Sequence, residues 1–571
     1  MIRSYFGVEL LATRALVMIL EVLASPFPRT QQPCRRPALV LEDLPAPARP
    51  QRPMMCLGTV QGGGIGMAAS AGLTACAGPR AASARAASAK QKAQKIKKKT
   101  AKKKRSFTIG CGAEYRKHLA FRRNWGLIRP SGKWVLHEDL LDVPMTGLSP
   151  REVDLLHIIW LVLQKKGYNP RAVDQAWLLC QSICRQGGPY KKHFFRGRLP
   201  GTPGFHLPVR GAVAMAPCVL PRGKLWFNCQ LRLGSGAEML QLQGVAVPSS
   251  IPWWRTEDMR LLKSIAGNAF TVTVIGCHCL VALLALASAG AMPPAASAGS
   301  DSGTLADSAG SAAGGVIEHL LDFASLADFL CQQLARVWPE CFGTVANCPR
   351  VISLGTLCSG GDFVVLVCRA LVDSLCFKAG MPLSLVTSFA CEYDPCVRAF
   401  RKRVVGDSLG PCWHDVHRLP LGSMSHCDLL VFGSSCKSLS SQNNNRRSLL
   451  DIDASDAAAT SGSTLHGCFS YVEKHRPKII IMENVTAMLS KVAPGNPLRN
   501  IDIVYRRLDA LGYKHGHGIF DSRDFMVPQS RARVYIWAAH PGFSPWVDKW
   551  AQIVGMCRPH VQLGLSACLL A

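Results

Sequence analysis

Short runs of β-branched residues alternate with longer helical stretches between residues 349 and 545. Strands that are separated by helices pair in parallel, because each crossover helix returns the chain to the same end of the sheet. The pattern therefore predicts an α/β fold with a doubly wound, mostly parallel sheet. The predicted strands are Val351–Leu354, Leu385–Phe389, Leu429–Phe432, Lys478–Met482 and Arg533–Ala538.

The residues before this segment predict parts of different character. Residues 1–112 are rich in Pro, Ala, Gly and basic side chains, which predicts a disordered leader. Aromatic side chains then become frequent, and 113–236 predicts a small irregular lobe with helices over about 150–166 and Arg171–Arg185. Residues 287–315 are rich in Ala, Gly and Ser, which is typical of a flexible linker.

The chain carries a formal net charge of +29, and part of it is concentrated in one run. Arg85–Arg105 contains eleven basic residues and no acidic one. Such a run stays solvated, and it predicts a nuclear localisation signal or an arm that binds phosphate, with a solubilising linker as the alternative. We expect a nuclear protein, although the apolar segment Met1–Phe27 leaves an organelle open.

One apolar segment has two interpretations. Ile265–Ser300 contains no charged side chain, and its centre is long enough to span a bilayer. It could equally be a helix buried in the core of the sheet domain. We favour the core helix and expect no stable membrane association.

The 24 cysteines show no metal-binding or disulfide pattern. Their spacing is irregular and includes no CxxC pair. This argues against a zinc ribbon and against a compact disulfide scaffold. We expect reduced thiols and no bound metal.

Reactive side chains occur at the ends of the later predicted strands. Cys436 follows the third strand after a glycine turn, Glu483 ends the fourth, and Arg531 and Arg533 lie at the start of the fifth. The carboxyl end of a parallel sheet is where α/β proteins bind ligands. Taken alone, each motif is weak, because a lone cysteine is usually a small core residue and Glu483 could cap a helix.

In this order and spacing the motifs resemble the (cytosine-5) DNA methyltransferase family. The resemblance implies that Cys436 is the nucleophile and that Glu483 binds N3 and the exocyclic amine of cytosine. It also implies that Arg533, with Arg531, contacts O2 of cytosine and supports the loop that carries Cys436, called the cysteine loop below. The target base would be flipped out of the duplex.

The segment Leu354–Phe363 resembles the glycine turn with which this family binds S-adenosylmethionine. Later residues resemble the acidic end of the next strand and the turn that contacts adenine. The cofactor-binding residues implied are Cys358, Ser359, Gly360, Gly361, Glu392, Tyr393, Asp415, Val416 and Asn268.

The order of the motifs indicates a circular permutation. Ala237–Gly244 resembles the family's Glu-x-x-x-Leu-Gln-Gly motif, and Ala266–Gly276 resembles its closing helix, yet both precede the glycine turn. A closing helix is buried in the core, which favours that interpretation of the apolar segment. The predicted parts are a leader (1–112), a target-recognition lobe (113–236), closing motifs (237–286), a linker (287–315), a cofactor and catalytic core (316–545) and a C-terminal tail (546–571).

Some positions depart from the family pattern. Ser435 stands where the family has proline, Lys437 stands where it has glutamine, and the glycine turn lacks the usual Asp-Leu-Phe opening. We expect S-adenosylmethionine-dependent methyl transfer to C5 of cytosine in DNA. A tRNA cytosine-5 methyltransferase of the same fold and a catalytically inactive nucleic-acid-binding relative are the alternatives. The sequence leaves the target sequence and the oligomeric state open.

Overall fold

The structure is a computed structural model of the 571-residue chain. The leader predicted at 1–112, with its basic run, lies outside the described residues, as does the predicted linker after residue 291. The described residues are scattered positions between 147 and 179, followed by 215–221, 223–291, 321–343, 349–406, 410–440, 460–491, 496–558 and 563–570.

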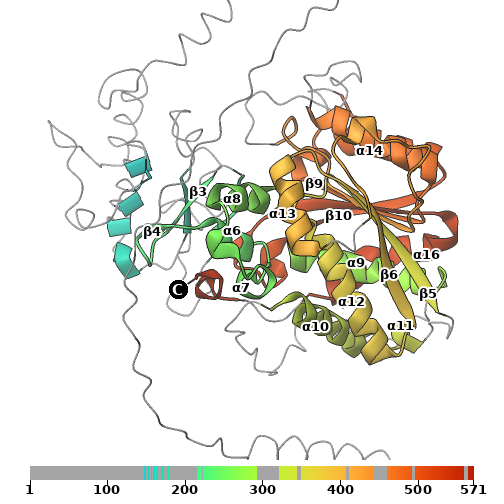
Figure 1. Cartoon of the computed structure of the whole chain (residues 1–571), viewed down its shortest axis with the longest axis horizontal. Coiled ribbons are helices and arrows are strands. Elements are labelled where there is room, and N and C mark those ends of the chain that lie inside the picture. The colour runs from blue at the N-terminus through green and yellow to red at the C-terminus, as the bar shows by residue number, and fades with distance from the viewer. Residues whose placement is uncertain are drawn as a thin grey trace, which may run out of the picture. The chain divides into compact units, whose positions relative to one another are not determined.

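A seven-stranded sheet forms the centre of the described chain, with strand order β10-β12-β9-β8-β5-β6-β7 (Figure 1). Strands β5 to β9 pair in parallel, whereas β12 runs antiparallel to both of its neighbours. The predicted α/β fold with a mostly parallel sheet is confirmed. The strands are β5 (Arg350–Leu357), β6 (Leu383–Cys391), β7 (Cys412–Trp413), β8 (Leu429–Phe432), β9 (Ile479–Val485), β10 (Lys514–Asp521) and β12 (Ala532–Ala539).

The five predicted strands correspond to β5, β6, β8, β9 and β12, but β7 and β10 were not predicted. Strand β10 has the sequence KHGHGIFD, which contains two glycines and no run of β-branched residues. It lies at one border of the sheet, where most of its residues remain partly exposed. A strand of this kind forms through pairing with β12 rather than through its own hydrophobic pattern.

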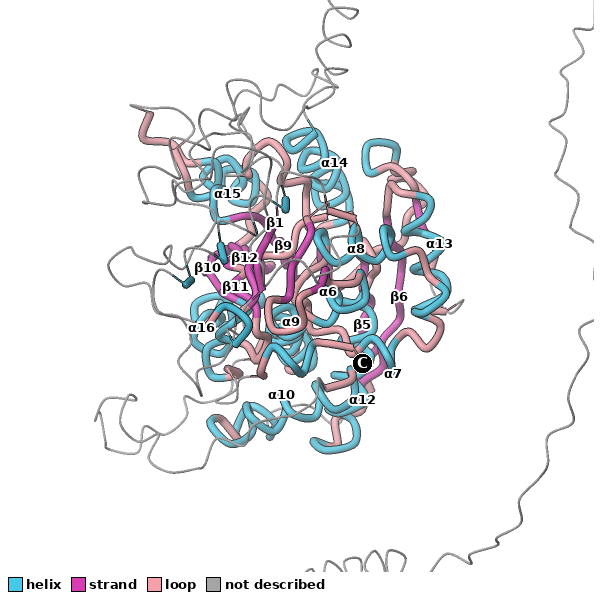
Figure 2. Tube along the Cα trace, turned by 90° about the vertical axis from the view of Figure 1, so that its left-hand side faces the viewer, coloured by secondary structure: helices cyan, strands magenta, loops and turns pink. Residues whose placement is uncertain are grey.

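Helices cover both faces of the sheet (Figures 1 and 2). Side chains of β9 alternate between the two cores: Ile479 and Ile481 pack on the side of α9, whereas Ile480 and Met482 pack on the side of α14. This alternation explains why the strand is apolar throughout. One face carries α9 (Val272–Ala287), α10 (Phe323–Val337), α12 (Phe363–Ala379) and α16 (Ser544–Met556), and the other carries α14 (Thr460–His475) and α15 (Asn500–Ala510).

The apolar segment forms a core helix. All sixteen residues of α9 are buried, and the helix packs against α12 and contacts β5. Among the described helices none is by itself long and apolar enough to cross a bilayer; α8 (Met259–Asn268) and α9 meet the criteria only together, and they are bent by 49° at their junction. The closing helix therefore begins at Val272, and the predicted Gly267-Asn268 entry is instead the end of α8.

The lobe before α6 contains more strand than the sequence indicated. Ala176–Leu179 forms β1, which pairs antiparallel with β3 (Lys224–Phe227), so the helix predicted over Arg171–Arg185 is wrong at these positions. Pairing with β3 buries Trp177, which an isolated helix here would not achieve. Two further short strands lie nearby: β2 (Ala216–Pro217) and β4 (Arg232–Leu233). Within the predicted 150–166 helix, the residues that the structure describes are helical.

The C-terminal residues belong to the sheet domain. Helix α16 begins at Ser544 and packs against α9 and β10, so the boundary predicted at 545 falls inside a helix. The amide of Leu570 donates to the carboxylate of Glu238 in α6 (Gly236–Gln241) over 3.1 Å. Arg232 forms an ion pair with the same carboxylate over 2.5 Å. This contact joins the end of the chain to the segment that precedes the sheet.

Candidate active site

Three adjacent strands bring the predicted catalytic side chains to one end of the sheet. Cys436 follows β8, Glu483 lies near the end of the neighbouring β9, and Arg533 lies at the start of β12. Because β12 is antiparallel to β9, its first residues lie beside the last residues of β9, and Arg533 is paired in register with Val485. Residues that are about 50 positions apart in sequence therefore converge.

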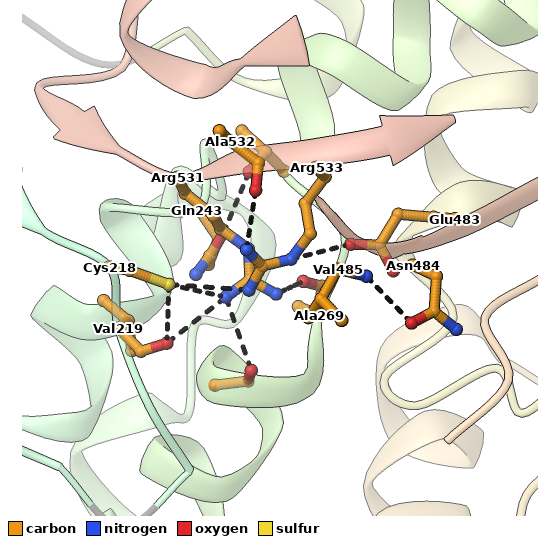
Figure 3. Close-up of polar contacts among 12 residues, drawn as sticks. Cys218, Val219, Gln243, Ala269, Glu483, Asn484, Val485, Arg531, Ala532 and Arg533 are labelled. Atoms are coloured by element: carbon orange, nitrogen blue, oxygen red, sulfur yellow. Dashed lines mark hydrogen bonds and ion pairs between the residues drawn. The ribbon is translucent and has the colours of Figure 1, made fainter. Parts of the chain in front are cut away.

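Glu483 and Arg533 form an ion pair. The Nε atom of Arg533 lies 3.0 Å from Oε1 of Glu483 (Figure 3), and the two side chains are only 15% and 13% exposed. Little water surrounds such a pair, so its electrostatic attraction is screened less than at the surface. The ion pair fixes the carboxylate at the carboxyl end of β9, on the face of the sheet that carries α9.

Asn484 connects β9 to the cysteine loop. Its buried amide donates to the carbonyl oxygen of Ser434 over 3.2 Å and to the hydroxyl of Ser434 over 3.1 Å. On the other side of the loop, the Ser435 amide donates to the hydroxyl of Thr464 over 3.0 Å. These bonds hold the loop although Ser435 replaces the proline of the family pattern.

The glycine turn before the cysteine is closely packed. A Cβ atom on Gly433 would lie 3.2 Å from the ring of Phe270 and 3.7 Å from the carboxylate of Glu483. Phe270 belongs to the junction between α8 and α9. The turn after β8 therefore lies against β9 and against the predicted closing motifs (237–286).

The environment of Cys436 favours a protonated thiol in the resting protein. Burial raises the pKa of the Cys436 thiol and the carboxylate of Glu483 raises it further, whereas Arg533 and Arg531 offset part of this effect. The same interactions show that these charged groups lie within electrostatic range of the sulfur. Nucleophilic attack by Cys436 thus requires a change that removes its proton.

The guanidinium of Arg531 is held by backbone carbonyls of the lobe and of the predicted closing motifs, and its predicted support of the cysteine loop stays a prediction. Its side chain is buried, and its guanidinium donates to the carbonyl oxygens of Val219 over 3.2 Å, Gly267 over 3.5 Å and Ala269 over 2.9 Å. These carbonyls belong to the lobe and to the predicted closing motifs. Arg531 thus joins three parts of the chain (Figure 3).

Cys218 is a site residue that the sequence analysis missed. Its sulfur accepts hydrogen bonds from Nη1 of Arg531 and from Nη2 of Arg533, each over 3.5 Å. Cys218 lies in a stretch that the sequence predicted as an irregular loop, and it belongs to no recognisable motif. No local signal marks a cysteine that contacts residues more than 300 positions away.

A further polar chain reinforces this junction. The side-chain amide of Gln529, in β11 (Gln529–Ser530), donates to the Leu242 carbonyl over 2.9 Å, and its oxygen lies 3.5 Å from the amide of Gln243. The hydroxyl of Thr271 donates to Gln243 over 3.1 Å. The predicted closing motifs thus contact the arginine-bearing segment directly.

The glycine turn after β5 has a backbone open to a ligand. Cys358, Gly360 and Asp362 all have positive φ angles, of 53°, 57° and 58°. No atom lies within 4 Å of the position that a Cβ on Gly360 would occupy. The Gly360 amide donates to the carboxylate of Glu392 over 2.8 Å, and the Ser359 amide donates to the Cys391 carbonyl over 3.0 Å. The turn is therefore joined to the end of β6 and leaves space beside Gly360.

The structure brings some of the other predicted cofactor residues to this turn. Tyr393 follows Glu392 directly and is 78% exposed. Ile265 of α8 lies 3.2 Å from the position of a Cβ on Gly361, which places α8 beside the turn. Asn268, however, donates to the Ser264 carbonyl in its own helix over 3.0 Å.

Asp415 and Val416 form the next part of this end of the sheet. The Asp415 carboxylate accepts a hydrogen bond from the His417 amide over 3.0 Å and caps the short helix η4 (Val416–Arg418). Val416 is buried, and its backbone lies against Gly467 of α14. Asp415 also lies within electrostatic range of Cys391 at the end of β6.

Part of the chain is similar to known DNA methyltransferases. Residues 410–551 match the family model described as C-5 cytosine-specific DNA methylase. The chain is 31% identical over 220 residues to the DNA (cytosine-5-)-methyltransferase DMT5 of Cryptococcus neoformans, a match that covers 36% of this chain and 8% of the relative. It is 35% identical over 78 residues to the type II methyltransferase M2.ScrFI of Lactococcus lactis, covering 14% of this chain and 21% of the relative. The chain thus spans a small part of the curated relatives it matches.

Among solved structures, the chain matches the Dnmt2 methyltransferase of S. pombe with 17% identity and a TM-score of 0.25. That match covers 33% of this chain and 51% of the other.

Proposed function

We propose that the chain belongs to the C-5 cytosine-specific DNA methylase family, whose model matches residues 410–551, and that it transfers a methyl group from S-adenosylmethionine to C5 of cytosine in DNA. The observation that supports this most is the convergence of Cys436, Glu483 and Arg533 at the end of the sheet that also carries the glycine turn. A thiol, a carboxylate and a guanidinium in one place are the groups that this reaction needs.

Cys436 is the proposed nucleophile. C5 of cytosine is weakly nucleophilic, and addition of a thiolate to C6 makes it electron-rich enough to accept a methyl group. The bond that forms is S–C6; after transfer, loss of the C5 proton releases the enzyme. The raised pKa of the Cys436 thiol means that thiolate formation accompanies binding of the base, with Arg533 and Arg531 favouring the anion.

Glu483 and Arg533 are proposed to bind the ring of the extruded base. The Glu483 carboxylate would accept from the exocyclic amine and hold a proton shared with N3, which offsets charge that develops on the ring. Arg533 would donate to O2. Their ion pair keeps both groups oriented before the base arrives, so little reorganisation is needed.

The glycine turn is the proposed site for S-adenosylmethionine, whose sulfonium supplies an electrophilic methyl group when it is bound there. The open space beside Gly360 fits a ligand that approaches the backbone closely. Glu392 would accept hydrogen bonds from ribose hydroxyls, because its carboxylate ends β6 next to the turn. Tyr393, exposed beside it, would cover an aromatic base.

We also propose that the chain is a permuted member of the family. The recognition lobe and closing motifs precede the glycine turn in sequence, yet Leu242 and Gln243 contact Gln529 across the fold. In an unpermuted member the closing helix would end the chain and the strand before the glycine turn would begin it. Here the end of α9 and the start of β5 lie together, because Arg350 donates to the Leu286 carbonyl over 3.0 Å. A connection through residues 287–315 is therefore favourable, since loop closure costs little extra free energy as a loop lengthens. Nuclear localisation remains a proposal that rests on the basic run at 85–105.

Covalent trapping tests the proposed function. A DNA duplex with 5-fluorocytosine blocks loss of the C5 substituent, so an active enzyme should form a stable adduct when S-adenosylmethionine is added. The adduct should disappear in Cys436→Ala and weaken strongly in Glu483→Gln. Absence of any adduct with the wild-type chain would contradict the proposal, and an adduct only with a fluorocytosine-containing tRNA would indicate an RNA substrate.

A further inference from the structure

We propose that Cys218 is a positioning residue for the methyl-transfer reaction: as a thiolate, it holds the guanidinium of Arg533 in the orientation that serves Glu483 and the target base. The inference rests on the proposed function, but it concerns a residue outside the predicted catalytic motifs. Cys218 belongs to the lobe that precedes the closing motifs, so it also links that lobe to the reacting end of the sheet.

The geometry places one sulfur between two cations. Nη2 of Arg533 and Nη1 of Arg531 each donate to the sulfur of Cys218 over 3.5 Å, as Figure 3 shows. Arg533 uses a different nitrogen, Nε, for its ion pair with Glu483. The remaining nitrogen, Nη1, donates to the carbonyl of Ala532 over 2.9 Å, so the guanidinium is held at all three of its nitrogen atoms by three separate acceptors, which fixes its plane.

The backbone around Cys218 is itself fixed to the arginine segment. Strand β2 pairs in parallel with β11, and the Ala216 amide donates to the Pro528 carbonyl over 2.7 Å. The carbonyl of Val219 accepts from Arg531. Cys218 thus lies between two backbone positions that are anchored to residues 528–531, which keeps its Cα beside the arginine segment.

Charge balance supports the anionic form. Arg531 and Arg533 carry two positive charges, whereas Glu483 supplies one negative charge, and the carbonyl partners of Arg531 supply none. An uncompensated charge in a buried site is costly, so loss of the Cys218 proton to solvent would make this group of side chains neutral. Burial acts to raise the pKa of the Cys218 thiol, but Arg533 and Arg531 outweigh it, and the net effect is a lowered pKa.

The pKa values of the two cysteines near these arginines are shifted in opposite directions. The pKa of Cys436 is raised, whereas that of Cys218 is lowered, although Arg531 and Arg533 act on both. Cys218 contacts both guanidinium groups, and Cys436 has the carboxylate of Glu483 nearby. In the resting protein the thiolate is at position 218, and its role is to orient Arg533 rather than to attack the substrate.

Thiol titration of the wild-type chain tests the ionisation directly. The protein is alkylated with iodoacetamide at a series of pH values, and mass spectrometry quantifies the peptides that contain Cys218 and Cys376. Cys376, near the far end of α12 from the glycine turn, is the internal control. The alkylation midpoint of Cys218 should lie below about 8.5, the ordinary value for cysteine. A midpoint at or above that of Cys376 would mean a neutral thiol that donates to the Val219 carbonyl, 3.6 Å away, and would overturn the proposal.

Substitution tests the positioning role. Cys218→Ala should reduce the rate of adduct formation with the fluorocytosine duplex by about 10- to 100-fold, as expected when a reacting group is misplaced. Duplex affinity should change much less, and Cys218→Asp, which restores an anion, should recover part of the rate. Cys376→Ser serves as the matched control and should react like the wild type.

The outcomes separate the inference from the function on which it rests. If the wild type forms no adduct, the proposed function fails, while the titration still decides whether Cys218 is ionised. If the wild type forms the adduct and Cys218→Ala forms it equally fast, the positioning role is wrong and the proposed function stands.

Discussion

Arg531 and Arg533 are two residues apart, yet the structure predicts different consequences when each is replaced by lysine: lower stability for Arg531→Lys and slower adduct formation for Arg533→Lys. Both substitutions keep the positive charge, so any difference arises from geometry. Arg531 donates to three carbonyl oxygens, from Val219, Gly267 and Ala269, whereas Arg533 forms an ion pair with Glu483 and donates to one carbonyl, that of Ala532. Both arginines also contact the sulfur of Cys218.

The magnitude follows from the number of bonds that a lysine cannot make. One ammonium in place of the Arg531 guanidinium loses about two hydrogen bonds from a charged donor, each worth about 1.5–3 kcal/mol. The Nε atom of Arg531 has no hydrogen-bond partner among the described residues, so its removal returns about 1–3 kcal/mol. The central values, about 4.5 kcal/mol lost and about 2 kcal/mol returned, lead us to expect that Arg531→Lys lowers the free energy of unfolding by about 2.5 kcal/mol. Arg533→Lys can keep an ion pair with Glu483, and it should lower the free energy of unfolding by only about 1 kcal/mol, chiefly through the lost bond to the Ala532 carbonyl.

Urea unfolding followed by tryptophan fluorescence measures the first effect, and trapping with the fluorocytosine duplex measures the second. Arg531→Lys should shift the urea midpoint to lower concentration, whereas Arg533→Lys should leave the midpoint nearly unchanged but slow adduct formation. An Arg531→Lys variant with a wild-type midpoint and no adduct would refute this reasoning. It would mean that Arg531 contacts the substrate, as the family resemblance implies.

Three further predictions concern buried groups around the site. Arg401→Met leaves the buried carboxylate of Asp362 without its partner 2.6 Å away, and it should lower the free energy of unfolding by about 3–5 kcal/mol near pH 8. The loss should be smaller at pH 5, where the carboxylate can take up a proton. Urea midpoints at both pH values test this, and equal losses would contradict it. Burial lowers the pKa of His278 from 6.5 to about 3, so the ring stays neutral in the folded protein. The unfolded chain takes up a proton at this residue below pH 6.5. Up to about 5 kcal/mol of the free energy of unfolding is therefore lost as the pH falls towards 3. His278→Phe should flatten the fall in urea midpoint between pH 6.5 and 4.5, and an unchanged pH profile would exclude this role. Asn484→Ala removes the bonds to Ser434 and should reduce the trapping rate more than duplex affinity, so a parallel loss of both would argue against a loop-specific effect.

The sequence predicted the parts of the fold that depend on local pattern. Runs of β-branched residues gave the positions of β5, β6, β8, β9 and β12, because a buried central strand must be apolar on both faces. The three side chains that converge were also predicted, since each follows or ends one of these strands. Strand β10, with its polar and glycine-rich sequence, depends on its partner and was missed.

Contacts between distant segments could not be predicted in the same way. Arg531 bonds to Val219 across 312 positions, and Cys218 lies 315 positions from Arg533. Nothing in either local sequence specifies these partners. The break between α8 and α9 was missed for a related reason: Ala266–Gly276 reads as one continuous apolar stretch, and only packing of Phe270 against Gly433 shows where it turns.

The glycine turn after β5 has one feature that the sequence predicts and one that depends on distant residues. Gly360 was expected to allow a close approach to a ligand, and its positive φ angle agrees with that expectation. Asp362 also has a positive φ angle, although it is not a glycine, and it is held there by bonds from Thr356 and Arg401 over 3.3 Å and 2.6 Å. Left-handed backbone at an aspartate is stabilised by partners that come from other elements, and a sequence motif does not reveal them.

The packing at Gly433 has a consequence for how this protein can diverge. Even a methyl group there would lie 3.2 Å from the ring of Phe270, which packs against the main hydrophobic core, and 3.7 Å from the carboxylate of Glu483. A related chain with a larger side chain at position 433 should stay folded, but the sulfur of Cys436 should be displaced from its position near Glu483. A larger residue at position 433 in a relative therefore predicts loss of the proposed methyl transfer while the sheet is retained.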